Sequence, residues 1–151
     1  MSRSRYFDGF EIGEELVSAE RILTAADINT FATLTGDHNP LHVDDDYAQA
    51  SIYGRRIAHG LLVQSIASGL LVNDGMLNGT AVGLRHVSCK LSAPVYIGDS
   101  IHVHSTVTEK KVIRRLNVGN ILVSFRVINQ ERVTVQKGTW QLLVKLSESN
   151  H

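Results

Sequence analysis

The segment from Gly60 to Val72 constrains the fold of this chain more than any other feature of the sequence. It reads GLLVQSIASGLLV, is the most apolar stretch of the 151 residues, and carries no charged side chain. Composition alone would also allow a buried strand, but the length of the segment and its lack of strong breakers favour a helix that is buried almost all round. Such a helix needs apolar partners on several sides, so other parts of the chain have to wrap around it.

After Gly79 the sequence takes on the character of β-strands. Val, Ile, Thr and Leu become frequent, and apolar residues recur at every second position. Four such stretches are separated by turn signals: residues 80–92, 98–110, 117–130 and 131–146. In the clearest case the residues that share one face are Ile121, Val123, Phe125 and Val127. We therefore predict an α+β domain whose long antiparallel strands wrap around the helix at 60–72.

The residues before the apolar helix predict shorter elements. Thr24 and Asp27 have the spacing of a capping box, which indicates a helix from about Ala25 to Leu34. Thr35-Gly36 ends this helix, and the run DDDYAQA at 44–50 indicates a second short helix with an acidic start. Four apolar residues are expected to anchor the N-terminal segment, with a short strand near the last of them: Phe7, Phe10, Ile12 and Leu16.

Length and composition predict one domain, residues 1–151, with 146–151 as a frayed tail. Fifteen basic residues balance fifteen acidic ones, and this neutrality argues against nucleic acid as a partner. Cys89 is the single cysteine, so a reducing, cytoplasmic compartment fits best. The N-terminus has no signal-peptide core, and no stretch is apolar over the roughly 18 residues of a membrane span.

The loop from Gly36 to Asp44, reading GDHNPLHVD, holds two groups that can transfer protons. Asp37 and His42 lie five residues apart, and Asn39-Pro40 between them favours a turn over plain helix. A carboxylate next to a neutral imidazole can hold one water and move protons in either direction near neutral pH. The loop alone leaves a second interpretation open, in which Asp37 and Asn39 only form turns and His42 is a surface residue.

The pair His59-Gly60 opens the apolar helix. The first backbone amides of a helix have no partner inside the helix and carry the positive end of its dipole. A glycine there lets a substrate oxygen come close to the backbone, so the Gly60 amide is a candidate oxyanion site for a thioester carbonyl. The alternative is that Gly60 only caps the helix or allows tight packing.

Other candidate residues are weaker. His38 and His42 have helical spacing but are interrupted by Pro40, and His102 and His104 would share one face of a strand, so we predict no metal site. Cys89 lies within a predicted strand with no activating neighbour and is read as a small buried hydrophobe. Four cationic residues are candidates for contact with phosphates: Arg55, Arg56, Arg85 and Lys90.

Three motifs together resemble a known family. The run from Phe31 to Ala48, F-x-x-L-T-G-D-x-N-P-L-H-x-D-x-x-x-A, resembles the hydratase motif of the MaoC-like, (R)-specific enoyl-CoA hydratases. The run G-R-R-I-A-H-G at 54–60 is similar to the family at its usual distance, as are A-P-V at 93–95 and G-D at 98–99. The resemblance covers nearly the whole chain, and the first motif is strongly specific.

The resemblance implies a hotdog fold, in which an antiparallel sheet of about five strands wraps around a long central helix. It implies a homodimer, or a larger homo-oligomer, with sheets joined edge to edge. The substrate would be an acyl-CoA or acyl-carrier-protein thioester, with no cofactor, metal, nucleic acid or membrane as a partner. By the resemblance Asp37 and His42 are catalytic and the Gly60 amide binds the thioester carbonyl. Asn39, Ser68 and His59 would support the site.

The function implied is that of a hydro-lyase. It would add water reversibly to a trans-2-enoyl-CoA to give an (R)-3-hydroxyacyl-CoA, or dehydrate a related hydroxyacyl-CoA. Two alternatives stay open at this point, a hotdog acyl-CoA thioesterase and a non-catalytic acyl-CoA-binding module. The paired Asp37 and His42 favour the hydro-lyase, because together they suit the addition of water to a double bond.

Overall fold

A computed structural model describes residues 4–147. The helical elements are η1 (Phe7–Gly9), α1 (Ala25–Thr35), α2 (Pro40–Val43), α3 (Asp45–Gln49), α4 (Gly60–Val72) and η2 (Arg114–Leu116). The strands are β1 (Glu15–Val17), β2 (Arg21–Ile22), β3 (Ala81–Leu91), β4 (Ser100–Ile113), β5 (Val118–Ile128) and β6 (Thr134–Lys145). They form an antiparallel six-stranded sheet in the order β1-β4-β5-β6-β3, with β2 also paired to β4. The predicted α+β class is confirmed, and the short β2 accounts for a sixth strand.

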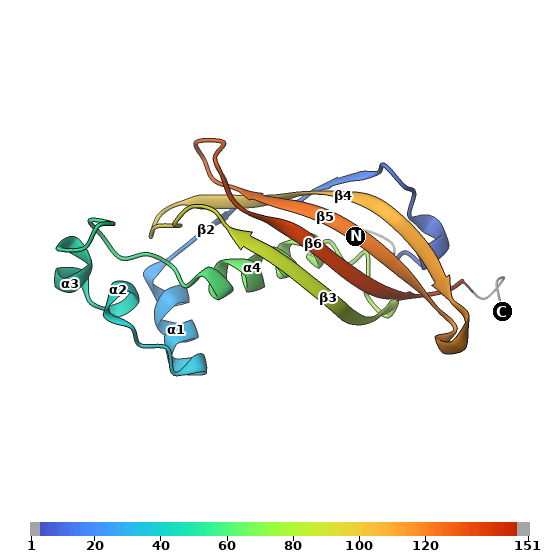
Figure 1. Ribbon diagram of the computed structural model, residues 1–151, viewed down its shortest axis with the longest axis horizontal. Helices are drawn as coiled ribbons and strands as arrows, with labels where there is room; N and C mark the ends of the chain where they lie inside the picture. The colour runs from blue at the N-terminus through green and yellow to red at the C-terminus, as the bar shows by residue number, and fades with distance from the viewer. Residues whose placement is uncertain (1–3, 148–151) are drawn as a thin grey trace.

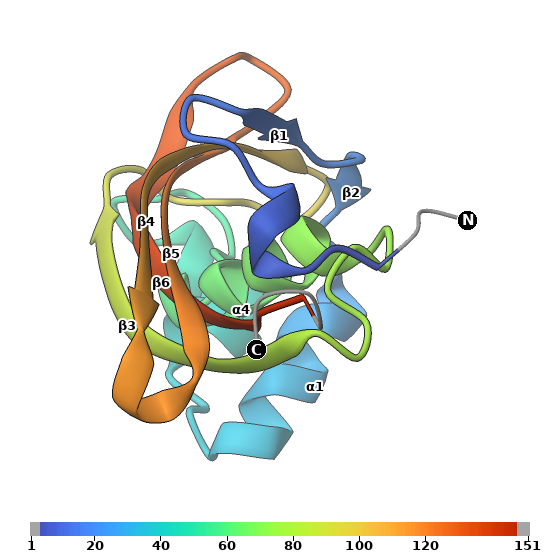
Figure 2. The same ribbon diagram turned by 90° about the vertical axis from the view of Figure 1, so that its right-hand side faces the viewer.

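The sheet curves around α4, as Figures 1 and 2 show. The helix spans the predicted residues and buries one side against the sheet, with Leu62, Val63, Ala67 and Leu71 in the core. The prediction of burial all round is wrong. Leu61 is 69% exposed, and Ser65 and Gly69, one and two turns further along, are exposed as well. The described sheet wraps only part of the helix and leaves this stripe uncovered.

Strand β5 shows how alternation builds the core. Its inward residues are buried as the sequence predicts, and they include Ile121, Val123, Phe125 and Val127. The Phe125 ring stacks on Trp140 of β6, with 3.8 Å between ring centroids and 7° between the planes. Burial of two aromatic side chains in parallel contact makes this pair a main apolar contribution at the centre of the sheet.

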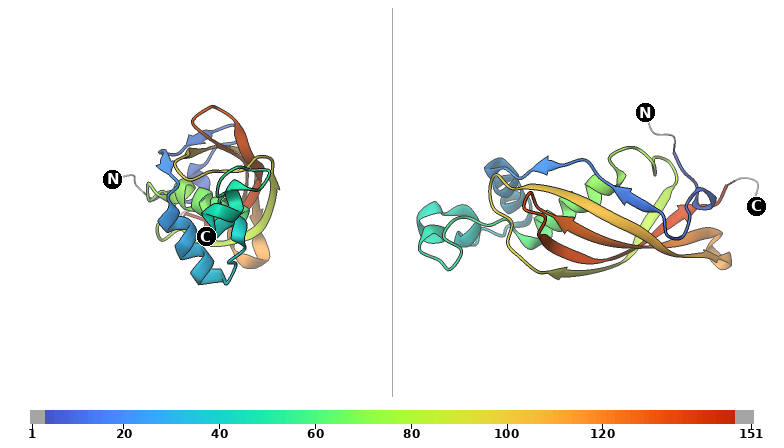
Figure 3. Two further views of the ribbon diagram at one scale, coloured as in Figure 1. Left: turned by 90° about the vertical axis from the view of Figure 1, so that its left-hand side faces the viewer. Right: turned by 90° about the horizontal axis from the view of Figure 1, so that it is seen from above.

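Helices α1, α2 and α3 gather at one end of the sheet, beside the start of α4 (Figures 1 and 3). The Thr24–Asp27 capping box at the start of α1 is present as predicted, and Gly36 ends the helix in the left-handed conformation, with φ of 83°. The sequence predicts no plain helix in the following loop, yet Pro40 begins the one-turn helix α2. Proline is tolerated at a first helical position, where its missing N–H would have no partner, and the Asn39 side chain caps this turn.

The two edges of the sheet are built differently. Beyond β4 lie the two short strands β1 and β2, whereas β3 forms the other edge over its full length. Of the predicted N-terminal anchors, Phe7 and Phe10 are buried and Leu16 packs on the core, but Ile12 is wrong because it is 65% exposed.

The last described residues, Leu146 and Ser147, lie near η1. Leu146 is buried and the Ser147 N–H donates to Asp8 Oδ2 at 2.9 Å, so the predicted fraying is wrong for these two residues. The rest of the predicted tail, residues 148–151, lies outside the described residues. Among the helices of residues 4–147, none combines the length and the apolar character needed to cross a bilayer.

Candidate active site

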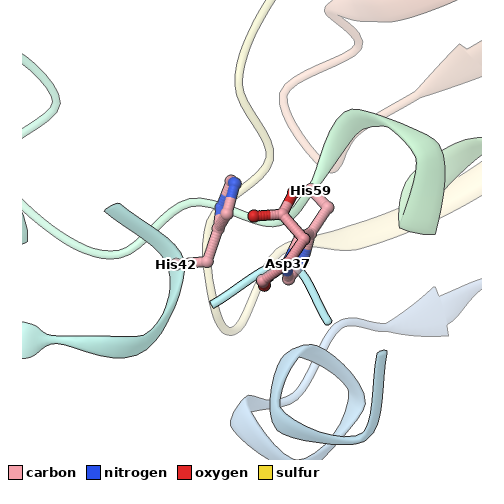
Figure 4. Close-up of side chains that lie close together, drawn as sticks. All are labelled: Asp37, His42 and His59. Atoms are coloured by element: carbon pink, nitrogen blue, oxygen red, sulfur yellow. The ribbon is translucent and has the colours of Figure 1, made fainter. Parts of the chain in front are cut away.

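Three side chains converge where the α1–α2 loop meets the start of α4. Figure 4 shows Asp37, His42 and His59 side by side. One carboxylate oxygen or ring nitrogen from each lies within 4.8 Å of the others. Two of these residues are the pair predicted from the GDHNPLHVD loop, and the third precedes Gly60.

His42 is held in one orientation by a backbone carbonyl. Its Nδ1 lies 2.8 Å from the Ile57 carbonyl oxygen, which can only accept, so Nδ1 carries the hydrogen. The other ring nitrogen, Nε2, then presents a lone pair. His42 lies on α2 and is half-buried, so this nitrogen is held in place while the site stays open to small molecules.

Asp37 follows the end of α1 and keeps most of its carboxylate free. The Thr35 hydroxyl accepts from the Asp37 N–H at 3.2 Å, and Asp37 Oδ1 accepts from the Asn39 N–H at the same distance. The side chain is exposed. Asn39 also accepts from the Leu41 N–H at 3.1 Å, which caps α2. These local hydrogen bonds shape the loop, and they leave Asp37 Oδ2 for other partners.

His59 supports both members of the pair. It is 3% exposed, and its Nε2 donates to the Asp37 carbonyl oxygen at 2.9 Å. Its ring stacks on His42 with 3.9 Å between centroids and 26° between planes, and Phe31 meets it edge-on. Within residues 4–147 its Nδ1 is buried without a hydrogen-bond partner. The ring thus fixes the spacing between the Asp37 backbone and the His42 side chain.

Arg56 holds the same loop through buried hydrogen bonds. Although it is an arginine, it is only 8% exposed, and its Nε donates to the His42 carbonyl oxygen. Its Nη2 donates to Asn29 Oδ1 at 2.8 Å, which links α2 to α1. The sequence marked Arg56 as a phosphate candidate. Because its guanidinium is committed to these buried contacts, we read it as a support of the loop.

Gly60 is the first residue of α4, and no described side chain caps this helix end. Its carbonyl accepts from Gln136 Nε2 at 2.8 Å, which fixes the peptide from the sheet side. A side chain at position 60 would place its Cβ 2.6 Å from Leu91 Cδ1, so the glycine leaves room for the Leu91 side chain of β3. A hollow of about 280 Å³ lies beside it, lined by Tyr53, Ile57, Ala58, Gly60, Val63, Leu91, Ser92, Ala93, Pro94, Val95 and Gln136.

The geometry of the three side chains favours a shared water over a shared metal ion. Lone pairs of imidazole lie in the ring plane, and those of the stacked His42 and His59 rings run side by side rather than converging. An ion bound to both would require one ring to turn. A water between Asp37 and His42 can instead donate one hydrogen to each, because a separation below 4.8 Å matches two hydrogen bonds through one oxygen.

The contacts of the remaining predicted residues involve other side chains and carbonyls than those of the cluster. Ser68 donates to the Ser65 carbonyl oxygen at 2.7 Å, two turns along α4 from Gly60. The Arg55 guanidinium covers the Tyr96 ring at 4.1 Å, and both Arg85 and Lys90 are exposed on β3.

Cys89 and the pair His102 and His104 lie on strands outside the cluster. Cys89 is half-buried, and burial raises the pKa of its thiol, which agrees with the interpretation as a small hydrophobe. His104 lies 3.6 Å from Glu15 across the β1–β4 pair.

Sequence reasoning missed two positioning residues. Gln136 gave no signal because it alternates within a strand like any other residue. The role of Arg56 was hidden because an arginine after Gly-Arg in a loop is normally exposed.

Known proteins share the sequence pattern and the fold of this chain. The family model described as "MaoC like domain" matches residues 9–127. The chain belongs to the MaoC-like family. A crystal structure of the MaoC-like dehydratase from Rhodospirillum rubrum has the same fold, with a TM-score of 0.83 and 26% identity over 95% of this chain and 98% of that one. The predicted hotdog architecture is confirmed.

Relatives of this MaoC-like chain with 29% to 38% identity are named as enoyl-CoA hydratases or as dehydratases of hydroxyacyl thioesters. The (R)-specific enoyl-CoA hydratase of Rhodospirillum rubrum is 38% identical over 112 residues, which cover 72% of this chain and 76% of that protein. Protein MaoC of Klebsiella aerogenes is 38% identical over 109 residues, 72% of this chain, but the chain spans only 32% of that longer protein.

Proposed function

We propose that this MaoC-like protein is a hydro-lyase that adds water reversibly to a trans-2-enoyl-CoA and gives an (R)-3-hydroxyacyl-CoA. One observation carries the proposal. A carboxylate oxygen of Asp37 and a ring nitrogen of His42 lie within 4.8 Å, a separation that one water can bridge, next to the uncapped start of α4. The names of the relatives support a thioester as the substrate.

The chemistry follows from what each group can hold. The bridging water passes a proton to Asp37 while its oxygen bonds to the β-carbon of the enoyl group, and His42 Nε2 accepts its second hydrogen bond. The electron pair of the double bond moves onto the thioester carbonyl, where the Gly60 amide and the positive end of α4 stabilise the enolate oxygen. The α-carbon then takes a proton back from the Asp37–His42 pair on the same face. Dehydration runs through the same steps in reverse.

The assembled enzyme is a homodimer joined through β3. This strand forms a sheet edge eleven residues long, and Val82, Leu84, Val87 and Leu91 are 44–56% exposed on it. A long apolar edge with free backbone groups favours pairing with another strand. A second copy is the occupant that can cover the edge, and Leu91 at its end already contacts the hollow beside Gly60.

Kinetics with crotonyl-CoA test the proposal. The absorbance of the enoyl thioester should fall as water adds, and chiral analysis should find the (R)-product. Asp37→Asn should lower kcat roughly 10²–10⁴-fold, the usual contribution of a general base. Asp46→Asn on α3 is the matched control, because this exposed carboxylate starts a helix outside the cluster, and it should leave the rate unchanged.

Two outcomes would remove the proposal. Full activity in Asp37→Asn would show that the assigned base takes no part. Release of free thiol from acyl-CoA, measured with a thiol reagent, without loss of the double bond would show thioester hydrolysis in place of hydration.

A further inference from the structure

A row of cations crosses the outer face of the sheet. Lys90 of β3 lies directly opposite Lys137 of β6, and Lys137 lies directly opposite Arg126 of β5. Their chain neighbours Gln136 and Val127 are buried on the side of α4. Because side chains alternate along a strand, the three cations lie on the outside of the curve that Figure 2 shows, and all three are exposed. We name Lys90, Lys137 and Arg126 the cation row.

The protein does not balance the charges of the cation row. Like charges placed directly opposite each other on neighbouring strands repel and destabilise a sheet. Among the described residues no carboxylate lies in ion-pair distance of any of the three cations. Beyond Arg126 the next strand carries His104, whose Nδ1 accepts from Arg126 Nη2 at 3.4 Å and whose Nε2 lies 3.6 Å from Glu15. In a chain of formal net charge zero, three facing cations without a counter-charge favour an anionic ligand.

A row of hydroxyl groups runs beside the cations. It consists of residues that also face one another across the strands: Thr106, Ser124, Thr139 and Ser88. The hydroxyls of Ser88 and Thr139 share a hydrogen bond of 2.8 Å. An open hollow of about 590 Å³ lies over both rows, and no described carboxylate lines it. The hollow therefore offers ammonium, guanidinium and hydroxyl donors from three strands on one surface.

The spacing of these donors selects among anions. Neighbouring strands lie about 4.8 Å apart, so the cation row extends over about 10 Å across three strands. A single phosphate beside one cation leaves the other two uncompensated, whereas a linear chain of phosphates carries negative charge along the same line. Lysine and arginine both bind phosphate oxygens through charge-assisted hydrogen bonds. The cation row thus matches an extended anion with several phosphate groups better than a compact one.

The same surface lacks the groups that bind other polyanions. Single-stranded nucleic acid binds through bases that stack on aromatic rings, and an anionic bilayer takes up apolar side chains beside the cations. The aromatic rings of these strands, Phe125 and Trp140, are buried and stack on each other. Among the described residues that line the hollow, no large apolar side chain is exposed. The ligand that fits is therefore charged along its length and carries no base or acyl chain.

We propose that the cation row binds a linear oligophosphate of at least three phosphate groups across β5, β6 and β3. The row lies on the opposite face of the sheet from α4 and Gly60, so it is separate from the candidate active site and does not depend on the proposed function. Bound phosphates replace repulsion among the three cations by attraction. The ligand therefore stabilises the folded chain as well as occupying the site.

Calorimetry with tripolyphosphate at constant ionic strength tests the site. The wild type should bind tripolyphosphate, and orthophosphate roughly tenfold more weakly, because one phosphate reaches fewer cations. Arg126→Gln/Lys137→Gln should bind tripolyphosphate roughly 25-fold more weakly, about fivefold for each exposed cation. Arg114→Gln/Arg115→Gln is the matched control, because it removes the same charge from exposed residues at the β4–β5 turn, and it should bind like wild type. Equal affinities in both variants would overturn the proposal.

Thermal unfolding supplies a second measure and shows that the variant folds. Without phosphate and at low ionic strength, Arg126→Gln/Lys137→Gln should unfold at the wild-type temperature or above it, because the repulsion is removed. Tripolyphosphate at about 100 times its wild-type Kd should raise the wild-type midpoint by about 5–10 °C. The same concentration should raise the midpoint of the double variant by only about 2–4 °C. Equal shifts in the two proteins would contradict a site at the cation row.

Two further ligands decide which phosphates the cation row binds. ATP should bind no more tightly than tripolyphosphate, since the hollow has no group for the base, and tighter binding of ATP would overturn the assignment to a bare oligophosphate. The KM for crotonyl-CoA should be the same in Arg126→Gln/Lys137→Gln and in wild type, because the row faces away from Gly60. A raised KM would assign the row to the substrate instead. Calorimetry needs no turnover, so the binding of tripolyphosphate is decided whatever the hydration assay shows.

Discussion

Both edges of the sheet have backbone N–H and C=O groups without a partner strand, and the two edges differ in how these groups are covered. On one side β4 is covered by β1 and β2, which are three and two residues long, and the segment before β1 is fixed by the Arg5–Glu14 ion pair at 2.7 Å. On the other side β3 runs for eleven residues with nothing paired to its outer edge within the described chain. Short, irregular edge strands protect a sheet from association, whereas a long apolar one promotes it.

The difference supports β3 as the edge through which we propose that two copies pair. Strand β3 has the same Val- and Leu-rich composition as buried strands, yet nearly every residue in it is exposed. Its inner neighbour β6 keeps Gly138 where the β3 backbone comes closest, so the outer strand is tightly attached to the sheet. A strand that is firmly held in the sheet and still exposed is available for pairing with another strand.

The largest effect is expected from charge on the open edge. Leu84→Lys/Val87→Lys should weaken the dimer roughly 1,000-fold, because like charges would meet across the two-fold axis at a cost of several kcal/mol. Sedimentation velocity should show monomers, hydratase activity should fall with the dimer, and the circular dichroism spectrum should stay native.

The matched control carries the same charges on the covered edge. Val17 and Ile22 are exposed on β1 and β2, and Val17→Lys/Ile22→Lys should leave both the dimer and the activity intact. Equal loss of dimer in both variants would remove the distinction between the edges, and a dimeric Leu84→Lys/Val87→Lys protein would place the interface elsewhere.

The second largest effect is expected where β3 packs against Gly138 of β6. In Gly138→Ala the new Cβ would lie 1.8 Å from the Ser88 carbonyl oxygen, which belongs to the backbone and cannot turn away. We expect the free energy of unfolding to drop by about 2–3 kcal/mol, as for overpacked sites that force backbone shifts. Urea unfolding measures the change. Gly83→Ala on β3 has open space at its Cβ and should change stability by less than about 0.5 kcal/mol.

The smallest effect belongs to the covered edge. The Arg5 guanidinium lowers the pKa of Glu14, so this ion pair stabilises the fold above the pKa of an unfolded-state glutamate and is lost as the pH falls through the lowered value. Glu14→Gln should reduce the free energy of unfolding by about 0.5–1 kcal/mol at pH 7. The difference from wild type should shrink as the pH falls through the lowered pKa of Glu14 and vanish below it. Glu20→Gln, which removes another exposed carboxylate, is the control and should leave the free energy of unfolding at pH 7 within about 0.5 kcal/mol of wild type.

Local patterns predicted the elements of this fold well. The α4 helix has its predicted bounds, and the capping box and the left-handed Gly36 define α1 as expected. These features depend on nearest neighbours in the sequence. The exposed stripe of Leu61, Ser65 and Gly69 could not be predicted, because a helix that faces a subunit boundary or solvent on one side has the same apolar composition as a fully enclosed one.

Some features of the candidate site could likewise be predicted from local sequence, whereas others depend on contacts between distant segments. Asp37, His42 and Gly60 could be singled out from the sequence because a turn, a proton-transfer pair and a helix start all leave local signals. That Asp37 and His42 lie together, and that His59 joins them by stacking on His42, depends on how the loop folds back on the start of α4. The burial of Arg56 and the reach of Gln136 to the Gly60 carbonyl arise from contacts between segments far apart in sequence, which composition and spacing do not encode.

The contact between Gly60 and Leu91 has a consequence for how this protein can vary over time. One leucine side chain touches both the residue that would hold the substrate carbonyl and the edge through which copies would join. A substitution of Leu91 would affect both the catalytic rate and the formation of the dimer. Drift at this position is therefore expected to be slower than at the other exposed apolar residues of β3, and any tolerated change should be accompanied by a change at the start of α4.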